Sequence, residues 1–105
     1  MEQPNLSYIN ELSRGDDAFR DKLISIVKTE FPHEKAQYFE NFESKNFRET
    51  AQNVHKLKHK ISILGLEKSY TIAEDYENSL RESNISGHEV FNEILQIMTD
   101  YLETL

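Results

Sequence analysis

Apolar residues recur at spacings of three and four along five segments of the chain, which is the period of amphipathic α-helices. The first segment is short, at about residues 6–13, and Gly15 follows it. The second covers about residues 16–44 and opens with two aspartates, which suit the positive end of a helix dipole. Its apolar positions are Phe19, Leu23, Ile26, Val27, Phe31, Ala36, Phe39 and Phe42.

Pro32 interrupts the second segment, and it either kinks this helix or starts a fresh one at its first turn. The third segment covers about residues 46–64. Asn46 and Glu49 form a loose capping box at its start, and Gly65 follows its end, where helices often finish with glycine. Its apolar stripe is Phe47, Ala51, Val54, Leu57, Ile61 and Leu64.

The last two segments cover about residues 68–81 and 86–105. Ser86 and Glu89 have the spacing of a capping box, so we expect Ser86 to cap the fifth helix. The apolar stripes are Ile72, Ala73, Tyr76 and Leu80, then Phe91, Ile94, Met98, Tyr101 and Leu105. Four long amphipathic helices joined by short connections predict an all-α protein, an antiparallel up-and-down four-helix bundle in one domain of residues 1–105. The additional short N-terminal helix is expected to lie as a lid across one end.

Composition narrows the class of protein. The 105 residues include no cysteine, which excludes disulfides, thiolate metal sites and a cysteine nucleophile. No stretch approaches the ~18 apolar residues of a membrane span, and the N-terminus lacks a signal-peptide pattern. A soluble, cytoplasmic and free-standing protein is the expectation. The net charge of −7 argues against nucleic acid as a partner.

One segment differs from this acidic background. Residues 54–60 hold three lysines and two histidines with no acid, which predicts a compact positive spot suited to one small anion. On a helical wheel of about 100° per residue, His55 falls on the exposed flank, with Lys58 between it and the edge of the core. Gln52, His59 and Ser62 share the flank of His55.

An exposed imidazole with a lysine on the next turn suits phosphoryl capture. A neutral imidazole is a nucleophile at cellular pH, and Lys58 would neutralise the phosphoryl oxygens. The chain has no Walker loop, kinase signature or acidic cluster for Mg²⁺, so we expect a phosphate carrier and not an enzyme. The plainer alternative is a surface histidine without a role.

His55 and His59 also have the i, i+4 spacing of a shared metal site. The lysines between them repel cations, however, and the sequence offers no third ligand. We therefore expect no metal and no cofactor in this chain.

The pattern around His55 resembles the histidine-containing phosphotransfer (HPt) domains of two-component phosphorelays. His55-Lys56-Leu57-Lys58 matches the start of the family's His-x-Leu-Lys-Gly motif, and Leu64-Gly65-Leu66 matches its later glycine-containing turn. Residues 12–19 look like the family's entry into its long helix, and residues 72–77 like the start of the helix after the histidine. The resemblance spans nearly the whole chain.

The resemblance implies a four-helix bundle that is phosphorylated on Nε2 of His55, with Lys58 steadying the phosphate. It implies a monomer whose partners are receiver domains of response regulators or of a hybrid sensor histidine kinase, with Mg²⁺ bound by the receiver. The residues expected to contact that partner are Gln52, Lys56, His59, Ser62, Ile63 and Leu66.

His59 departs from the family pattern, because HPt domains usually have glycine four residues after the histidine. Its ring would lie on the approach path of the partner. It could donate a hydrogen bond to the phosphate, select an unusual receiver or slow the transfer. The departure motivates a second hypothesis, an HPt-shaped adaptor that binds a receiver or kinase without carrying phosphate.

Overall fold

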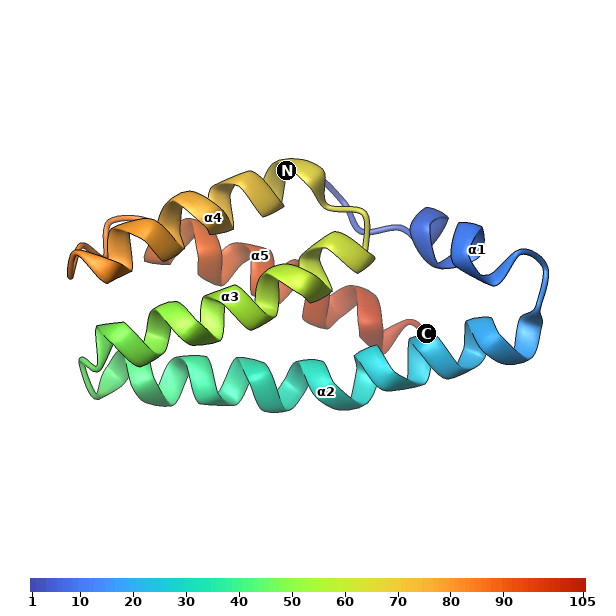
Figure 1. The fold of residues 1–105 in the computed structure, drawn as a ribbon, viewed down its shortest axis with the longest axis horizontal. Coiled ribbons are helices and arrows are strands. Elements are labelled where there is room, and N and C mark those ends of the chain that lie inside the picture. The colour runs from blue at the N-terminus through green and yellow to red at the C-terminus, as the bar shows by residue number, and fades with distance from the viewer.

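The computed structural model describes residues 1–105 and contains five α-helices and no strand (Figure 1). The helices are α1 (Ser7–Ser13), α2 (Asp17–Glu43), α3 (Phe47–Ile63), α4 (Glu67–Arg81) and α5 (His88–Glu103). The prediction of an all-helical chain with a short additional N-terminal helix is therefore confirmed. None of these helices has the length and apolar character needed to cross a membrane.

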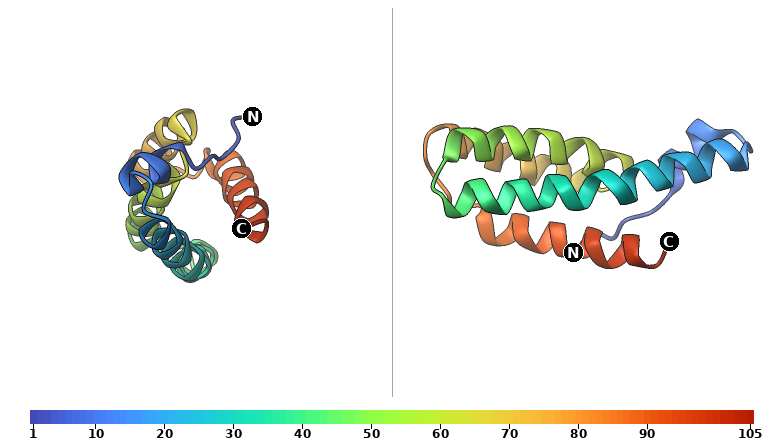
Figure 2. Two further views of the ribbon diagram at one scale, coloured as in Figure 1. Left: turned by 90° about the vertical axis from the view of Figure 1, so that its right-hand side faces the viewer. Right: turned by 90° about the horizontal axis from the view of Figure 1, so that it is seen from below.

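The four longer helices lie along the long axis of a molecule that measures 44 × 23 × 19 Å. α3 packs against both α2 and α4, and α5 contacts α4 and α2. The end-on view in Figure 2 shows α5 on the side away from α3. α1 lies beside the N-terminal part of α2, which extends beyond the end of α3 (Figure 1). The short helix is thus a neighbour of α2 at one end, and not a lid laid across that end.

Two helix starts follow directly from local sequence. The Asp16 side chain accepts a hydrogen bond from Phe19 N at 3.0 Å, and Asn46 accepts one from Glu49 N at 3.5 Å. Each satisfies one of the backbone N–H groups that a helix leaves free at its first turn. α2 continues through Pro32 as one helix, so Pro32 does not begin a new one.

The capping box expected at Ser86 is wrong. Gly87 is the N-cap of α5, and no side chain caps this helix.

The start of α4 is capped by a residue from the far end of the sequence. The carboxylate of Glu2 accepts hydrogen bonds from Lys68 N at 3.0 Å and Ser69 N at 2.9 Å. Close by, Asn5 N donates to Leu64 O at 2.9 Å. Gly65 has φ +76°, and a Cβ there would lie 2.6 Å from Asn5 Oδ1. The turn that follows α3 therefore needs glycine for its backbone conformation, and a side chain at this position would have to displace that of Asn5.

The core contains the predicted stripes of α3, α4 and α5, but α2 differs from its prediction. Tyr38, which was not on the predicted stripe, is fully buried and contacts the rings of Phe39, Phe42, Tyr76 and Phe91. Ala36 is exposed, and Phe19 and Ile26 are each about two-fifths exposed. All three positions are wrong as core residues. Phe19 is in the first turn of α2, which extends past α3, whereas Ile26, next to the buried Val27, and Ala36 lie on the solvent side of the helix.

Candidate functional site

His55 lies on the exposed side of α3, and its side chain is 50% exposed. Gln52, Lys56, His59 and Ser62 are exposed as well. The helical wheel therefore placed His55 and its neighbours Gln52, His59 and Ser62 correctly, because α3 packs with one face on α2 and another on α4 and leaves this flank free.

A buried carboxylate that the sequence analysis missed lies beside His55. Glu77 projects from α4 into the interface with α3, and its side chain is only 7% exposed. Its Oε2 is 3.3 Å from Nδ1 of His55. The same oxygen accepts a hydrogen bond from Nη2 of Arg81 at 2.8 Å. Nδ1 of the imidazole is therefore directed at Glu77, and Nε2, on the far side of the ring, is directed away from it.

Lys58 is buried rather than free at the edge of the core. Its side chain is 8% exposed, and its Nζ is 3.0 Å from Oε1 of Glu77. The ammonium also lies 5.3 Å from the centre of the Tyr70 ring. Its charge is therefore directed at Glu77 and Tyr70, so in this arrangement it acts on His55 through the carboxylate that both residues contact.

The ionisation state of Glu77 follows from these neighbours. Burial on its own would raise the pKa of the Glu77 carboxyl. The hydrogen bond from Arg81, together with Lys58 and the charge of His55, outweighs burial and lowers the pKa below its usual value. Glu77 is thus an anion at neutral pH.

The compact positive spot predicted for residues 54–60 does not exist. Lys60 points to the opposite side of α3 from Lys58, where its Nζ contacts Glu30 at 3.0 Å and Glu34 at 3.2 Å. Of the three lysines only Lys56 is exposed. The prediction failed because a run of lysines in one helix faces several directions, and two of them meet acids from neighbouring helices.

His59 lies one turn beyond His55, and the two rings meet edge to face with centroids 5.5 Å apart. No group of three or more histidine, cysteine, aspartate or glutamate side chains is arranged to hold a metal ion.

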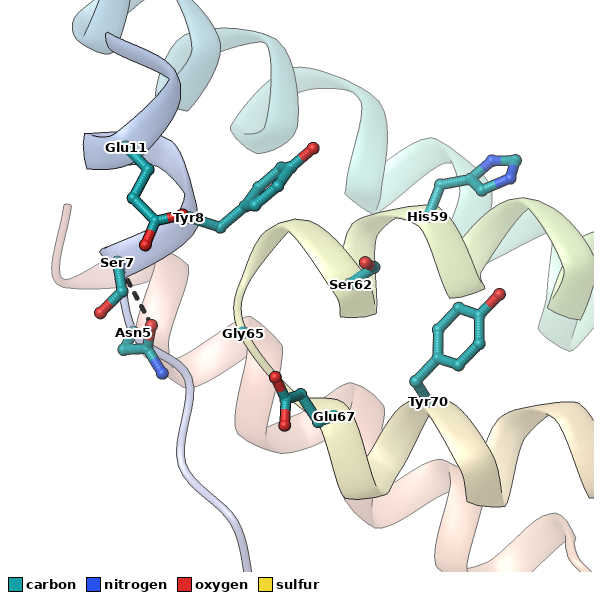
Figure 3. A pocket seen from close by; sticks show the side chains of 9 residues that line it. All are labelled: Asn5, Ser7, Tyr8, Glu11, His59, Ser62, Gly65, Glu67 and Tyr70. Atoms are coloured by element: carbon teal, nitrogen blue, oxygen red, sulfur yellow. Dashed lines mark hydrogen bonds between the residues drawn. The ribbon is translucent and has the colours of Figure 1, made fainter. Parts of the chain in front are cut away.

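His59 also borders a hollow of about 530 Å³ between α1, the end of α3 and the start of α4. Figure 3 shows the rings of Tyr8 and Tyr70 approaching it from α1 and α4, with Ser62 of α3 between them. The other lining residues are Asn5, Ser7, Glu11, Gly65 and Glu67.

The two apolar residues expected to contact a partner differ in position. Ile63 is half-buried and packs against the core cluster. Leu66 is 1% exposed and belongs to the core, so its expected place on the surface is wrong. The physical reason is that Leu66 lies at the tight turn between α3 and α4, where its side chain points back between the helices.

Glu77 could have been found from the spacing of residues in its own helix. Ala73, Tyr76 and Leu80 form the apolar stripe of α4, and residue 77 follows Ala73 by four. An acid on the buried stripe requires partners, and Arg81 stands four residues further on. Tyr70 gave no comparable signal.

No protein-family model, curated protein or solved structure matches this chain.

Proposed function

We propose that this protein is a phosphate carrier of the HPt type, with an antiparallel up-and-down four-helix bundle and His55 as the phosphoacceptor. The observation that carries the proposal is the half-exposed imidazole of His55 with its Nδ1 held 3.3 Å from a buried carboxylate. Fixing one ring nitrogen in this way leaves the other, Nε2, as the nucleophile.

In the proposed reaction a receiver domain docks beside α3 with phosphorylated aspartate and Mg²⁺ of its own. Nε2 of His55 attacks phosphorus in line, the Nε2–P bond forms and the P–O bond to the aspartate breaks. A second receiver later takes the phosphoryl group by the reverse step. This chain holds the imidazole in place and supplies the charges around it, whereas the receiver activates the phosphoryl group. We propose that the protein acts as a monomer in the cytoplasm.

The charges around His55 favour an arriving phosphoryl group. Lys58 and Arg81 bring two positive charges to the single negative charge of Glu77. The cluster beside the imidazole therefore keeps a positive charge, which stabilises an anion bound nearby. Arg81 is 43% exposed and has N–H groups beyond the one used by Glu77, whereas Lys58 contributes from the buried side.

Apolar contacts for the receiver should include Tyr8 of α1. Its side chain is 44% exposed and lines the same hollow as His59, one turn of α3 beyond His55. Exposed apolar side chains are common at protein-binding sites.

The test is phosphate transfer from an isolated, phosphorylated receiver domain. The wild-type protein should acquire a label that is stable in base and labile in acid, and His55→Gln should acquire none. His33→Gln is the matched control, because His33 is an exposed histidine on α2, and it should be labelled like the wild type. Absence of label with every receiver of the host, or equal labelling of His55→Gln, would contradict the proposal.

The second candidate function is an adaptor of the same shape that binds a receiver or kinase without carrying phosphate. The ring of His59, 5.5 Å from that of His55, favours it because it occupies space that an approaching phosphoaspartate needs. The His55→Ala variant separates the two functions. If partner binding and the cellular phenotype both survive in this variant, the protein is an adaptor.

A further inference from the structure

The contact between Glu77 and His55 favours one position for the imidazole proton. The Glu77 carboxylate is ionised, so it can only accept hydrogen bonds. Its Oε2 lies 3.3 Å from Nδ1, and this contact is more favourable when that nitrogen carries the proton. Glu77 itself is held in place from two sides, by Lys58 at Oε1 and by Arg81 at Oε2.

The same carboxylate would act on the phosphorylated ring. With a phosphoryl group on Nε2, Nδ1 has either a free lone pair or a proton. A lone pair would face the lone pairs of Glu77 Oε2, and a proton would be shared with them. The charged and titratable groups on the faces of α3 and α4 beside the ring are Glu74, Glu77 and Arg81 on α4, and Lys56, Lys58 and His59 on α3. Of these, Glu77 is the one in polar contact with the imidazole. Glu77 therefore favours the protonated, cationic ring.

We propose that Glu77 is a positioning residue that keeps Nδ1 of phosphorylated His55 protonated and thereby makes its phosphoryl group readily transferable. This inference rests on the proposed function and deepens it. It concerns how fast the phosphoryl group leaves, whereas the proposed function concerns whether His55 receives it.

Atoms and electrons balance without an additional reactant. When the phosphoryl group leaves, the Nε2–P bond breaks and its electron pair returns to Nε2. The acceptor is the aspartate of a second receiver, or water in the slow decay to inorganic phosphate, in which case the water gives up its proton to the solvent. With the proton on Nδ1, the leaving group is neutral imidazole. Without it, the leaving group is imidazolate, a far stronger base and a poorer leaving group.

The first experiment loads the protein chemically, so that it does not depend on a receiver. Phosphoramidate phosphorylates exposed histidines, and the loss of acid-labile phosphate is then followed as a function of pH. The decay rate of the wild type should fall with a midpoint at the pH where Nδ1 loses its proton. In Glu77→Gln this midpoint should be lower by about one pH unit or more. At a pH above both midpoints, the phosphate of this variant should decay about tenfold more slowly for each pH unit by which its midpoint is lowered.

Two variants control for damage to the fold. Glu77→Gln leaves Lys58 buried without an anion, so the double variant Lys58→Met/Glu77→Gln is measured beside it. Its midpoint should also lie below that of the wild type, but by less, because a neighbouring positive charge is removed as well. Asp75→Asn changes an exposed carboxylate on the other side of the same helix and should keep the wild-type midpoint. A purely structural role of Glu77 would alter stability and leave the midpoint of each folded variant unchanged.

The second readout needs no phosphate. ¹⁵N NMR of the histidines at neutral pH should give the Nδ1–H tautomer for His55 in the wild type. An Nε2–H tautomer overturns the inference whether or not the protein can be phosphorylated. So does an identical decay midpoint in the wild type and the folded Glu77 variants, an outcome that leaves the proposed function intact. Conversely, the decay midpoint could depend on Glu77 while no receiver transfers phosphate to the protein. That result would contradict the proposed function and leave the role of Glu77 in place.

Discussion

Two consecutive residues of α4 enter two buried polar sites of opposite kinds. Tyr76 points into the aromatic core, where its hydroxyl meets that of Tyr38 at 2.6 Å and Phe91 packs beside it. Glu77 points toward α3, where its carboxylate contacts Lys58, Arg81 and the imidazole of His55. One site is neutral and enclosed, and the other is charged and reaches the surface through His55.

The difference shows what each kind of burial requires. Burial raises the pKa of both tyrosines, so they stay uncharged, and a single hydrogen bond satisfies the two hydroxyls. A buried carboxylate is far more costly without counter-charges, and Glu77 therefore lies where α3 can supply a lysine and α4 an arginine. Because such a cluster needs several polar groups, it can extend to a half-exposed reactive side chain, whereas the tyrosine pair ends in the core.

The largest effect is expected when the charged site loses its anion. Glu77→Leu leaves Lys58 buried without a partner, and the free energy of unfolding should fall by about 3 kcal/mol or more, measured by urea denaturation. Lys58→Met/Glu77→Leu should recover most of this loss, since both charges are then gone. Glu74→Leu, at an exposed position, should change stability by less than about 0.5 kcal/mol. Wild-type stability in Glu77→Leu would mean that Lys58 has no need of the carboxylate.

A smaller loss is expected in the neutral site. Tyr38→Phe removes one hydroxyl and leaves that of Tyr76 buried without a partner, which should lower the free energy of unfolding by about 1–2 kcal/mol. Tyr38→Phe/Tyr76→Phe should be less destabilised than the sum of the single variants, because no hydroxyl is then left unpaired. Labelling of His55 should be unaffected in both. Loss of labelling in a stable Tyr38→Phe protein would show that the two sites are not independent.

The smallest expected effect is a difference between the two sites in how the free energy of unfolding depends on pH. Because its cationic neighbours lower the pKa of Glu77 below the usual 4.5, the unfolded chain binds more protons than the folded one as pH falls through this range. The stabilisation by Glu77 is complete above about pH 4.5 and is lost as pH falls through the lowered pKa. In urea denaturation at a series of pH values, Lys58→Met/Glu77→Leu should show a shallower acid loss than the wild type, and Tyr38→Phe/Tyr76→Phe an unchanged one.

Part of the stability lost at low pH should still be lost in both double variants. The pKa of Glu2 is also lowered: burial would raise it, but the backbone N–H groups of Lys68 and Ser69 hold the carboxylate ionised. An acid loss in Lys58→Met/Glu77→Leu that equals that of the wild type would therefore assign the whole effect to Glu2 and other acids.

Much of the local structure could be predicted because it depends on neighbours in sequence. The period of apolar residues located all five helices, and Asp16 and Asn46 marked two of their starts. The capping prediction at Ser86 failed because the motif matched while the side chain made no bond to the backbone. The stripe of α2 was the least accurate, since this 27-residue helix changes partners along its length, from α1 to α3 and α5.

The candidate site divides in the same way. The exposure of His55 followed from its angle on a single helix. The positions of the Lys58 and Lys60 side chains could not be predicted in this way, because each lysine pairs with acids from another helix. Lys58 contacts Glu77 on α4, and Lys60 contacts Glu30 and Glu34 on α2. Leu66 was expected to contact a partner because it is apolar and off the stripe of its helix, but the turn after α3 directs its side chain into the core.

The sequence by itself determined the helices, the exposed flank of α3 and the place of His55 on it, since each depends on interactions within a few residues. Only the tertiary structure decided which ring nitrogen of His55 is held, which lysines are neutralised and how α4 begins. Glu77 reaches His55 across 22 positions of the chain, and Glu2 reaches Ser69 across 67. Such contacts form where packing brings helices together, and the local pattern of polar and apolar residues does not encode which side chains meet there.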